Sequence, residues 1–339
     1  MIFTKTALCR ILTYILPLII SVRAYAQDPQ FSQFYANPMY VNPAFAGSSN
    51  VGRLVLNTRN QWPSVSGSFT TVNASYDEHF AAINGGLGIQ AHYDEQGTGV
   101  LKTVGLNVAY SYQIPVSRKF TLRLALQGGF MQKSVDFGKF LWRSQLGING
   151  FNGNPGEPMI GEGKTNITNF AAGVLGYSKN FYFGFSTHNM FEPDQSFGLY
   201  NSATTVTVPI YRRYTGHVGF VYPLNYTKNK NKASYLYPNI IYIQQGFGSK
   251  PFWQLNVGGY VSKGALVGGL YLRQTAANTD ALIAIIGIRT EKVKIGFSYD
   301  GTVSTLGAGA PNSYEVSLAF ELRKKVRRRN PRPITCPDF

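Results

Sequence analysis

The feature that most constrains the fold is a regular alternation of residue types over residues 101–132. Alternate positions carry mostly Leu, Val or an aromatic residue, with small or polar residues between them, in two arms on either side of Pro115. Successive side chains of a β-strand point to opposite faces, so a period of two predicts a β-hairpin whose faces lie in different surroundings. Leu124 then lies on the apolar face and Ala125 on the other. If the apolar face meets lipid, Leu124→Arg should cost roughly 2–4 kcal/mol, and Ala125→Arg on the opposite face should be far milder.

The spacing of aromatic residues on the apolar face indicates a membrane. Phe120 and Phe130 would stand about 23 Å apart in height, at about 3.3 Å per residue and a strand tilt of roughly 45°. This height matches the lipid-facing band of an outer-membrane β-barrel, and Tyr110, Tyr112 and Phe120 would belong to one of its aromatic girdles. The alternative is a soluble β-sandwich, in which the apolar face packs against a second sheet.

The first 26 residues predict export. Lys5 and Arg10 precede an apolar run over residues 11–22, which is too short to span a bilayer, and Ala24-Tyr25-Ala26 supplies small residues for signal-peptidase cleavage. We predict that residues 1–26 are a signal peptide and that the mature chain begins at Gln27. Its removal leaves Cys336 as the only cysteine, so the mature chain has no intramolecular disulfide.

The rest of the chain has no run of eighteen consecutive apolar residues, so helices are not expected to hold it in a membrane. Strands of a transmembrane barrel need only alternate residues to be apolar. The composition agrees with a barrel, since 14% of the residues are charged, against about 25% in average soluble domains. The predicted fold class is therefore all-β, a transmembrane antiparallel β-barrel.

Period-two runs predict about fourteen strands, an even number as expected for a single-chain bacterial barrel. The barrel would comprise residues 51–322, preceded by an N-terminal segment, 27–50, and followed by a basic periplasmic tail, 323–339. The N-terminal segment has three prolines and no alternation, and it is either a plug inside the barrel or periplasmic. The predicted strands are 51–62, 69–79, 83–94, 101–114, 118–132, 166–177, 180–190, 210–222, 235–246, 251–261, 265–273, 281–290, 292–300 and 313–322.

The connections between these strands predict the orientation of the barrel. With a periplasmic N-terminus, the longest connections, 133–165, 191–209 and 301–312, fall on the outer side, and most inner turns are tight. The exception is the basic connection 225–232, which would be periplasmic.

Motifs at both ends of the chain resemble one family. The N-terminal segment contains Asp28-Pro29, Phe31-Ser32-Gln33-Phe34-Tyr35, Asn37-Pro38, Asn42-Pro43-Ala44 and Ala46-Gly47, and the chain ends in Cys336-Pro337-Asp338-Phe339. Together they resemble the PorP/SprF family of Bacteroidetes outer-membrane proteins. The resemblance implies a non-enzymatic barrel of the type IX secretion and gliding machinery, located in the outer membrane. It also implies support for export or surface anchoring of adhesin-type cargo, and contacts with lipid and with periplasmic machinery proteins.

No residue pattern predicts catalysis, a cofactor or a metal site. The four histidines include no H-x-x-x-H pair, and there is no cysteine pair to complete a zinc site. His188 near Asp194 is the nearest hint of a catalytic pair. The formal net charge is +16, but nucleic acid is not an expected partner, because the chain carries an export signal and no motif of a nucleic-acid reader.

Charged residues at inward positions leave two functions open. Alternation places Arg53, Arg59, Arg123, Glu315 and Glu321 toward the lumen, where they either pair and help to fill it or line an aqueous path. A passive diffusion channel for small solutes is therefore the alternative to a secretion component. The candidate partner-binding residues are the aromatic residues of the N-terminal motif and the basic and terminal residues of the tail: Phe31, Phe34, Tyr35, Arg327, Arg328, Arg329, Cys336 and Phe339.

Overall fold

The structure is a computed structural model. It describes residues 28–49, 51–140, 145–147, 150–151, 163–197, 200–201, 204–205, 207–225, 233–246, 251–276, 279–303 and 311–322. The predicted signal peptide, the predicted basic tail with its five candidate residues, and most of the basic connection 225–232 lie outside the described residues.

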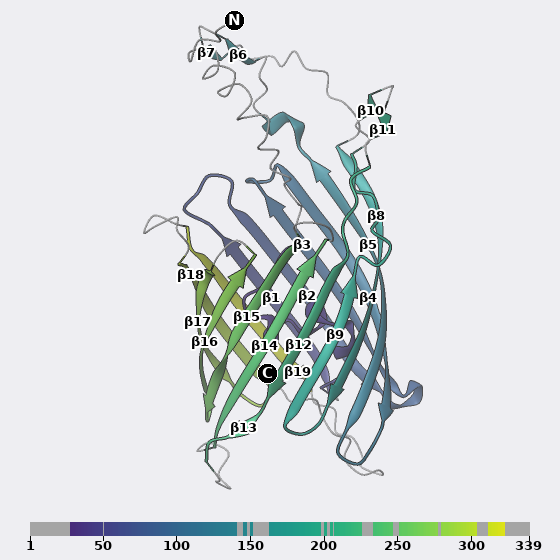
Figure 1. Cartoon of the computed structure of the whole chain (residues 1–339), viewed down its shortest axis with the longest axis vertical. Helices are drawn as coiled ribbons and strands as arrows, with labels where there is room; N and C mark the ends of the chain where they lie inside the picture. Colours follow the sequence, from purple (N-terminus) through teal and green to yellow (C-terminus); the bar gives the residue numbers. More distant parts are fainter. Residues whose placement is uncertain are drawn as a thin grey trace, which may run out of the picture.

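Long antiparallel strands form one closed ring within the described residues (Figure 1). Each strand pairs with its neighbours in the chain, and the first pairs with the last from Gly52↔Leu322 to Gln61↔Ser313, which leaves the ring without an open edge. The fourteen strands are β1 (Gly52–Gln61), β2 (Phe69–Phe80), β3 (Gly85–Gln96), β4 (Leu101–Pro115), β5 (Thr121–Val135), β8 (Lys164–Tyr177), β9 (Phe181–His188), β12 (Arg213–Phe220), β14 (Ser234–Gln245), β15 (Phe252–Lys263), β16 (Leu266–Thr275), β17 (Thr279–Arg289), β18 (Val293–Thr302) and β19 (Ser313–Leu322).

All fourteen predicted strands are confirmed, with differences at their ends. The predicted strand 180–190 is too long, because Asn189 has a left-handed backbone (φ 56°) that turns the chain away after β9. The predicted strand 210–222 is split at Val221 into β12 and a short extra strand. The extra strands are β13 (Tyr222–Pro223), which pairs with β14, and two small hairpins in the long connections, β6 (Leu146–Gly147) with β7 (Gly150–Phe151) and β10 (Tyr200–Asn201) with β11 (Thr204–Thr205).

The two faces of the β4–β5 hairpin differ as the alternation predicts. Val108 and Leu126 on the outer face are 53% and 69% exposed, whereas Ala109 and Ala125 on the inner face are 1% and 6% exposed. Large apolar side chains cover the outside of the other strands in the same way. A surface of this kind is not stable in water and requires lipid. The soluble β-sandwich is therefore wrong, because the strands form one closed ring and not two stacked sheets.

The two ends of the barrel carry different connections (Figure 1). Long connections follow β5, β9 and β18, and we call the end of the barrel at which these strands finish the long-loop end. Turns such as 116–120, 178–180 and 290–292 lie at the opposite, short-turn end. Two of the connections include single 3-10 turns, η3 (Ala81–Ile83) and η4 (Phe137–Lys139). No helix within the described ranges combines the length and the apolar character that a bilayer span requires.

Residues 28–49 lie inside the ring, and we call them the interior segment (Figure 1). They form η1 (Phe34–Ala36), α2 (Pro38–Val41) and η2 (Pro43–Phe45). Asn-Pro pairs begin both α2 and η2, because proline is compatible with a first helical position and Asn42 caps η2 by accepting a hydrogen bond from the Ala44 N–H. The short helices let the segment fold back on itself while its side chains reach the surrounding wall.

Candidate functional site

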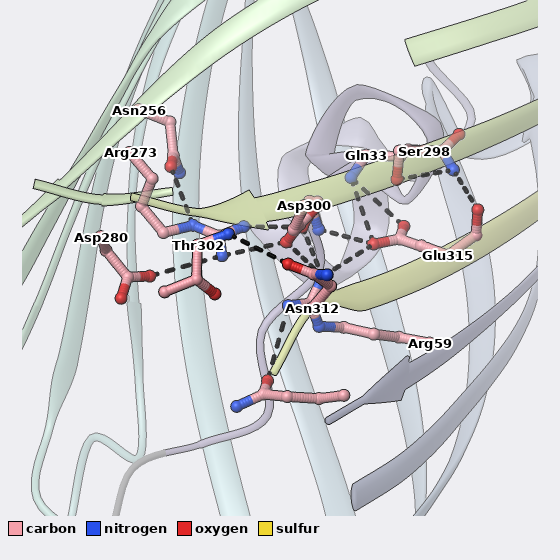
Figure 2. Close-up of polar contacts among 12 residues, drawn as sticks. Gln33, Arg59, Asn256, Arg273, Asp280, Ser298, Asp300, Thr302, Asn312 and Glu315 are labelled. Atoms are coloured by element: carbon pink, nitrogen blue, oxygen red, sulfur yellow. Dashed lines mark hydrogen bonds and ion pairs between the residues drawn. The ribbon is translucent and has the colours of Figure 1, made fainter. Parts of the chain in front are cut away.

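Four charged side chains of the barrel wall converge on the first part of the interior segment. Arg59 of β1, Arg273 of β16, Asp300 of β18 and Glu315 of β19 form what we call the charged cluster (Figure 2). Asp300 Oδ2 lies 2.9 Å from Arg59 Nη1 and 3.0 Å from Arg273 Nη1, and Glu315 Oε2 lies 3.7 Å from Arg59 Nη1. All four side chains are buried, and their formal charges cancel.

Ser32 lies at the centre of the charged cluster. Its hydroxyl donates to Asp300 Oδ2 at 2.5 Å and accepts from Arg273 Nη2 at 2.6 Å and from Arg59 Nη1. Its backbone N–H donates to Glu315 Oε2 at 2.6 Å. A serine hydroxyl has one donor and two acceptor positions, and here all three are used. The interior segment therefore supplies a hydroxyl that bonds to Asp300 and to both arginines, which also contact Asp300 directly.

Gln33 extends this contact along β18 and β19 (Figure 2). Its backbone N–H donates to Glu315 Oε1 at 3.2 Å, and its amide nitrogen donates to the Glu315 carbonyl at 3.0 Å. Its amide oxygen accepts from the Ser317 hydroxyl at 2.6 Å. A Cβ atom at Gly296 would overlap this oxygen, so the wall needs glycine at that position to admit Gln33.

Aromatic side chains hold the next two residues of the interior segment. Tyr237 of β14, Tyr260 of β15 and Tyr271 of β16 face inward, and we call them the tyrosine wall. The Phe34 ring meets Tyr271 edge-on at 5.3 Å, and the Tyr35 ring lies 5.1 Å from Tyr260. Ile241, Ile283 and Ile285 complete this cluster. An apolar patch of this size is unusual inside a barrel, where the lumen is normally polar, and it provides a binding surface for the segment.

Two arginines anchor the other end of the interior segment. Arg123 of β5, which is fully buried, donates to the carbonyls of Ala46 at 2.7 Å and Gly47 at 2.9 Å. Arg53 of β1 pairs with Asp77 of β2 at 2.9 Å, and Asp77 also accepts from the Gly47 N–H at 2.8 Å. The backbone at Gly47 is left-handed (φ 67°), which lets the chain turn between these two contacts and continue into β1.

The first described residue, Asp28, is also tied to the wall. Its carboxylate lies 3.2 Å from Arg213 Nη1 of β12 and accepts from Asn189 Nδ2 at 3.1 Å. The Arg213 guanidinium lies over the Tyr40 ring, 4.8 Å from its centre, and donates to the Tyr40 carbonyl at 3.3 Å. The interior segment is thus bound to the wall near its beginning, middle and end.

The structure brings some of the predicted site residues together. Phe31, Phe34 and Tyr35 are 6%, 7% and 9% exposed. Phe34 and Tyr35 contact the tyrosine wall, and the Phe31 ring contacts Tyr40 of the same segment. Their predicted role in partner binding stays a prediction, as does that of the five tail residues, which lie outside the described residues. The predicted inward positions of four charged residues agree with their burial: Arg53, Arg59, Arg123 and Glu315. Glu321 pairs with Lys294 at 2.8 Å near the short-turn end.

Several anchoring residues are not among the predicted site residues: Arg273, Asp300, Arg213, Asp77 and the pair Ser32-Gln33. Arg273 and Asp300 have a detectable signal, since each lies on a predicted alternating run with its charge at an inward position. Ser32 and Gln33 belong to the N-terminal motif, but no periodicity points to their role, because Asp300 and Glu315, which they bind, lie 268 and 282 residues away in the chain.

The described residues contain no arrangement that indicates catalysis or metal binding. No group of three His, Cys, Asp or Glu side chains in this part of the chain is placed to hold a metal ion. His188 is buried, whereas Asp194 is exposed and its carboxylate accepts hydrogen bonds from Ser196 and Val208. His188 is thus a buried residue at the end of β9, and Asp194 accepts hydrogen bonds within an exposed loop.

A closed fourteen-strand ring with an apolar outside and a polar, filled inside defines an outer-membrane β-barrel protein. The family model described as "Type IX secretion system membrane protein PorP/SprF" matches residues 23–320. The chain belongs to the PorP/SprF family, as its terminal motifs predict. Fold and family together point to the outer membrane and to a membrane component of type IX secretion.

Solved barrels of other bacteria are similar in outline only. The toluene transporter TbuX of Ralstonia pickettii is 9% identical, with 85% of this chain and 94% of that chain covered and a TM-score of 0.49. Omp33 of Acinetobacter baumannii is 8% identical, with 81% and 100% covered and a TM-score of 0.42. At these scores the likenesses carry no argument about function. No curated relative matches the chain.

Proposed function

We propose that this protein is a non-enzymatic scaffold of the type IX secretion and gliding machinery, which supports export or surface anchoring of adhesin-type cargo and contacts periplasmic partners. The observation that carries the proposal is the occupied interior. The charged cluster and the tyrosine wall bind consecutive residues of the interior segment. A barrel filled in this way is suited to presenting its ends to other proteins.

The alternative function is passive diffusion of small solutes through the lumen. Two cavities of about 70 and 60 Å³ lie beside the interior segment, the first toward the long-loop end and the second toward the short-turn end. A channel would have to connect such spaces past residues that are almost completely buried, such as Gln33 and Asn42. This arrangement favours the scaffold over the channel.

Liposome swelling separates these two functions. We expect the purified full-length protein to admit small sugars slowly, because the interior segment fills the lumen. A variant without residues 28–49 is the positive control, and we expect it to admit the same sugars rapidly if it folds. Its folding is checked by heat-modifiable migration on a gel. Rapid swelling with the full-length protein would favour the channel.

The basic tail is the proposed contact with periplasmic partners. Residues 323–332 contain seven basic residues and no acidic one, so they attract acidic surfaces over roughly 8 Å at physiological salt. We expect replacement of Arg327, Arg328 and Arg329 by Gln to reduce partner capture and surface display of cargo without reducing the abundance of the barrel. Cys336 and Phe339 would add specificity to the contact.

A matched control removes the same charge from the short-turn end. Arg118, Lys119 and Lys179 are exposed in its turns, and their replacement by Gln should leave capture and display unchanged. Equal losses in the two triple variants would mean that only the total charge matters. Normal capture and display by a variant that lacks residues 324–339 would contradict a role for the tail.

Protease treatment of intact cells tests the proposed orientation. We expect cleavage within 133–165, whose Asn152-Gly153-Asn154-Pro155-Gly156 sequence is typical of turns, because this connection belongs to the proposed outer side. Cleavage only after the outer membrane is opened would invert the orientation. Sequencing of the mature N-terminus tests the proposed signal-peptide cleavage before Gln27.

A further inference from the structure

The outer face of the barrel carries a stack of phenylalanine rings at the short-turn end. The rings come from the residue before β5, from β9 and from β12, and we call them the phenylalanine stack: Phe120, Phe181, Phe183 and Phe220. The centres of the rings in contact lie 6.2–6.4 Å apart, and Phe183 and Phe220 are 44% and 51% exposed. The proposed scaffold function gives this stack no role, so a ligand bound there would be a separate property of the protein.

The barrel wall holds two of these rings in place at Gly176 of β8. Gly176 pairs with Leu122 of β5 and with Phe183 of β9. A Cβ atom at this position would lie 2.7 Å from Phe183 Cζ and 2.9 Å from Phe120 Cζ, so any side chain there would have to displace a ring. Both rings therefore rest directly on the β8 backbone and form a fixed apolar surface.

The phenylalanine stack lies at the depth where the acyl chains of a lipid begin. Phe181 is the first residue of β9, and Phe120 immediately precedes β5. Phe183 lies about 5 Å deeper, at about 3.3 Å per residue and a strand tilt of roughly 45°. Aromatic side chains are enriched at this boundary between headgroups and hydrocarbon. A ligand of the stack must therefore have an apolar part that reaches into the membrane.

Three exposed cations lie beside the stack. Arg118 and Lys119 belong to the turn 116–120, and Lys179 belongs to the turn 178–180. The two turns are neighbours, because Thr121 pairs with Tyr177 where the strands leave them. Neither turn contains Asp or Glu, and neither do the strands β5, β8, β9 and β12. This sector of the barrel therefore has an uncompensated positive charge next to an apolar surface, and it complements an anionic group with an apolar tail.

The sector around the turn 290–292, at the same end of the barrel, is different. Lys292 follows Glu291 in the chain, and Lys294 pairs with Glu321 at 2.8 Å. The outward side chain at the end of β17 is the aliphatic Ile288, which is 50% exposed. Cations at the short-turn end are thus accompanied by carboxylates there, and the combination of phenylalanine rings with surplus cations belongs to the sector of β5, β8, β9 and β12.

We propose that this sector binds one acidic phospholipid, whose phosphate lies between Lys119 and Lys179 and whose acyl chains pack on the phenylalanine stack. The cations attract the anionic headgroup, as basic residues near a membrane surface do. Arg118 adds to this attraction from the tip of its turn. A lipid fits this surface better than an acidic periplasmic protein does, because the stack faces the hydrocarbon, which a water-soluble partner does not reach.

Native mass spectrometry of the purified full-length barrel in detergent micelles tests the proposal. The probes are phosphatidylglycerol and phosphatidylethanolamine with the same acyl chains, and glycerol 3-phosphate as a phosphate without chains. We expect one phosphatidylglycerol per barrel, bound at least about tenfold more tightly than either of the other probes. Equal affinity for the two lipids would make the proposal wrong. Equal affinity for glycerol 3-phosphate would mean that the site takes a free phosphate and not a lipid, which would also overturn it.

Variants of the cations locate the headgroup. The double variant Lys119→Gln with Lys179→Gln should weaken binding of phosphatidylglycerol by about thirtyfold, because it removes two cations near the anionic headgroup. The matched control is Lys263→Gln with Lys292→Gln, which removes the same charge from exposed positions at the same end of the barrel. Affinity should be unchanged in the control. Equal losses in the two double variants would mean that only the total charge matters, and the proposed site would be wrong.

A variant of the stack locates the acyl chains. Phe183→Leu should weaken binding of phosphatidylglycerol by about threefold, since an aromatic contact is lost from the apolar surface. The matched control is Phe297→Leu on β18, where the side chain is 40% exposed on the outer face but lies outside the stack. Affinity should be unchanged in the control. Heat-modifiable migration on a gel shows that all four variants are folded.

Two further results would overturn the proposal. One is unchanged affinity for phosphatidylglycerol both in the double variant at Lys119 and Lys179 and in Phe183→Leu, which would place the lipid elsewhere. The other is loss of a periplasmic protein from that double variant with full retention of phosphatidylglycerol, which would assign the cations to a protein contact. Because lipid binding is measured on the purified barrel, its failure is independent of cargo display and of partner capture by the tail.

Discussion

Two neighbouring sectors of the inner wall bind two neighbouring pairs of residues in the interior segment, and their chemistry differs. The charged cluster on β1, β16, β18 and β19 binds Ser32 and Gln33 through hydrogen bonds to buried ions. The tyrosine wall on β14, β15 and β16 packs against Phe34 and Tyr35. The segment therefore changes from polar to aromatic where the wall does.

The two sectors contribute differently to the position and to the stability of the interior segment. Hydrogen bonds to ions are directional and fail when a group moves by about an ångström, whereas apolar burial depends on area and tolerates small shifts. Removing one member of a buried ionic cluster leaves its partners uncompensated. We infer that the charged cluster determines where the segment lies, and that the tyrosine wall adds stability to that position.

Loss of Asp300 should have the largest effect. Asp300→Leu leaves the buried Arg59 and Arg273 without their shared carboxylate, so we expect the free energy of unfolding to fall by about 3–5 kcal/mol. Urea unfolding in micelles, followed by tryptophan fluorescence, measures it. The control is Asp136→Leu, which changes an exposed carboxylate that caps a single turn and should cost about 1 kcal/mol or less. Similar decreases in the free energy of unfolding in the two variants would mean that the charged cluster has no special role in stability.

An arginine on the lipid face of β5 should have the next largest effect. Leu124→Arg is expected to destabilise the inserted barrel by about 2–4 kcal/mol. The expectation that Ala125→Arg is far milder is wrong for this interior, because Ala125 is 6% exposed and belongs to a buried cluster with Ala44 and Phe45. Ala125→Arg should also destabilise the barrel and displace the segment. Tolerance of Ala125→Arg would mean that this part of the lumen is solvated.

The ionic contacts should be coupled to each other. When Arg59→Leu is added to Asp300→Leu, the total loss should be smaller than the sum of the two single losses by about 0.5–3 kcal/mol, because the second change removes a charge that the first left unpaired. A double-mutant cycle by urea unfolding measures the difference. Simple additivity would mean that the two side chains act independently.

The smallest effect is expected from a change in the contact between the interior segment and the tyrosine wall. Phe34→Leu keeps an apolar side chain and loses mainly the edge-to-face contact with Tyr271, so the expected cost is about 0.5–1.5 kcal/mol. Phe130→Leu makes the same substitution on the outer face, where the side chain is 51% exposed, and should cost less. If Phe34→Leu lowers the free energy of unfolding as much as Asp300→Leu does, the roles inferred for the charged cluster and the tyrosine wall are wrong.

The alternation of residues was sufficient to predict the number of strands and the faces of the hairpin. Each strand is a local pattern of period two, and a lipid-facing side must be apolar at every second residue whatever the neighbouring strand is. The same pattern predicts that Arg59, Arg123 and Glu315 point inward, which their burial agrees with. Strand ends were less predictable, because a single left-handed residue such as Asn189 ends β9 without changing the hydrophobic pattern.

The sequence by itself therefore determined the all-β class, the strands and the family, whereas only the tertiary structure decided what fills the barrel. Residues 27–50 are compatible with a plug or with a periplasmic segment, since aromatic and Asn-Pro residues suit either. The contact of Ser32 with Asp300 and Arg273 joins residues 268 and 241 positions apart. Such contacts depend on how the strands are registered around the closed ring, and no local periodicity carries that information.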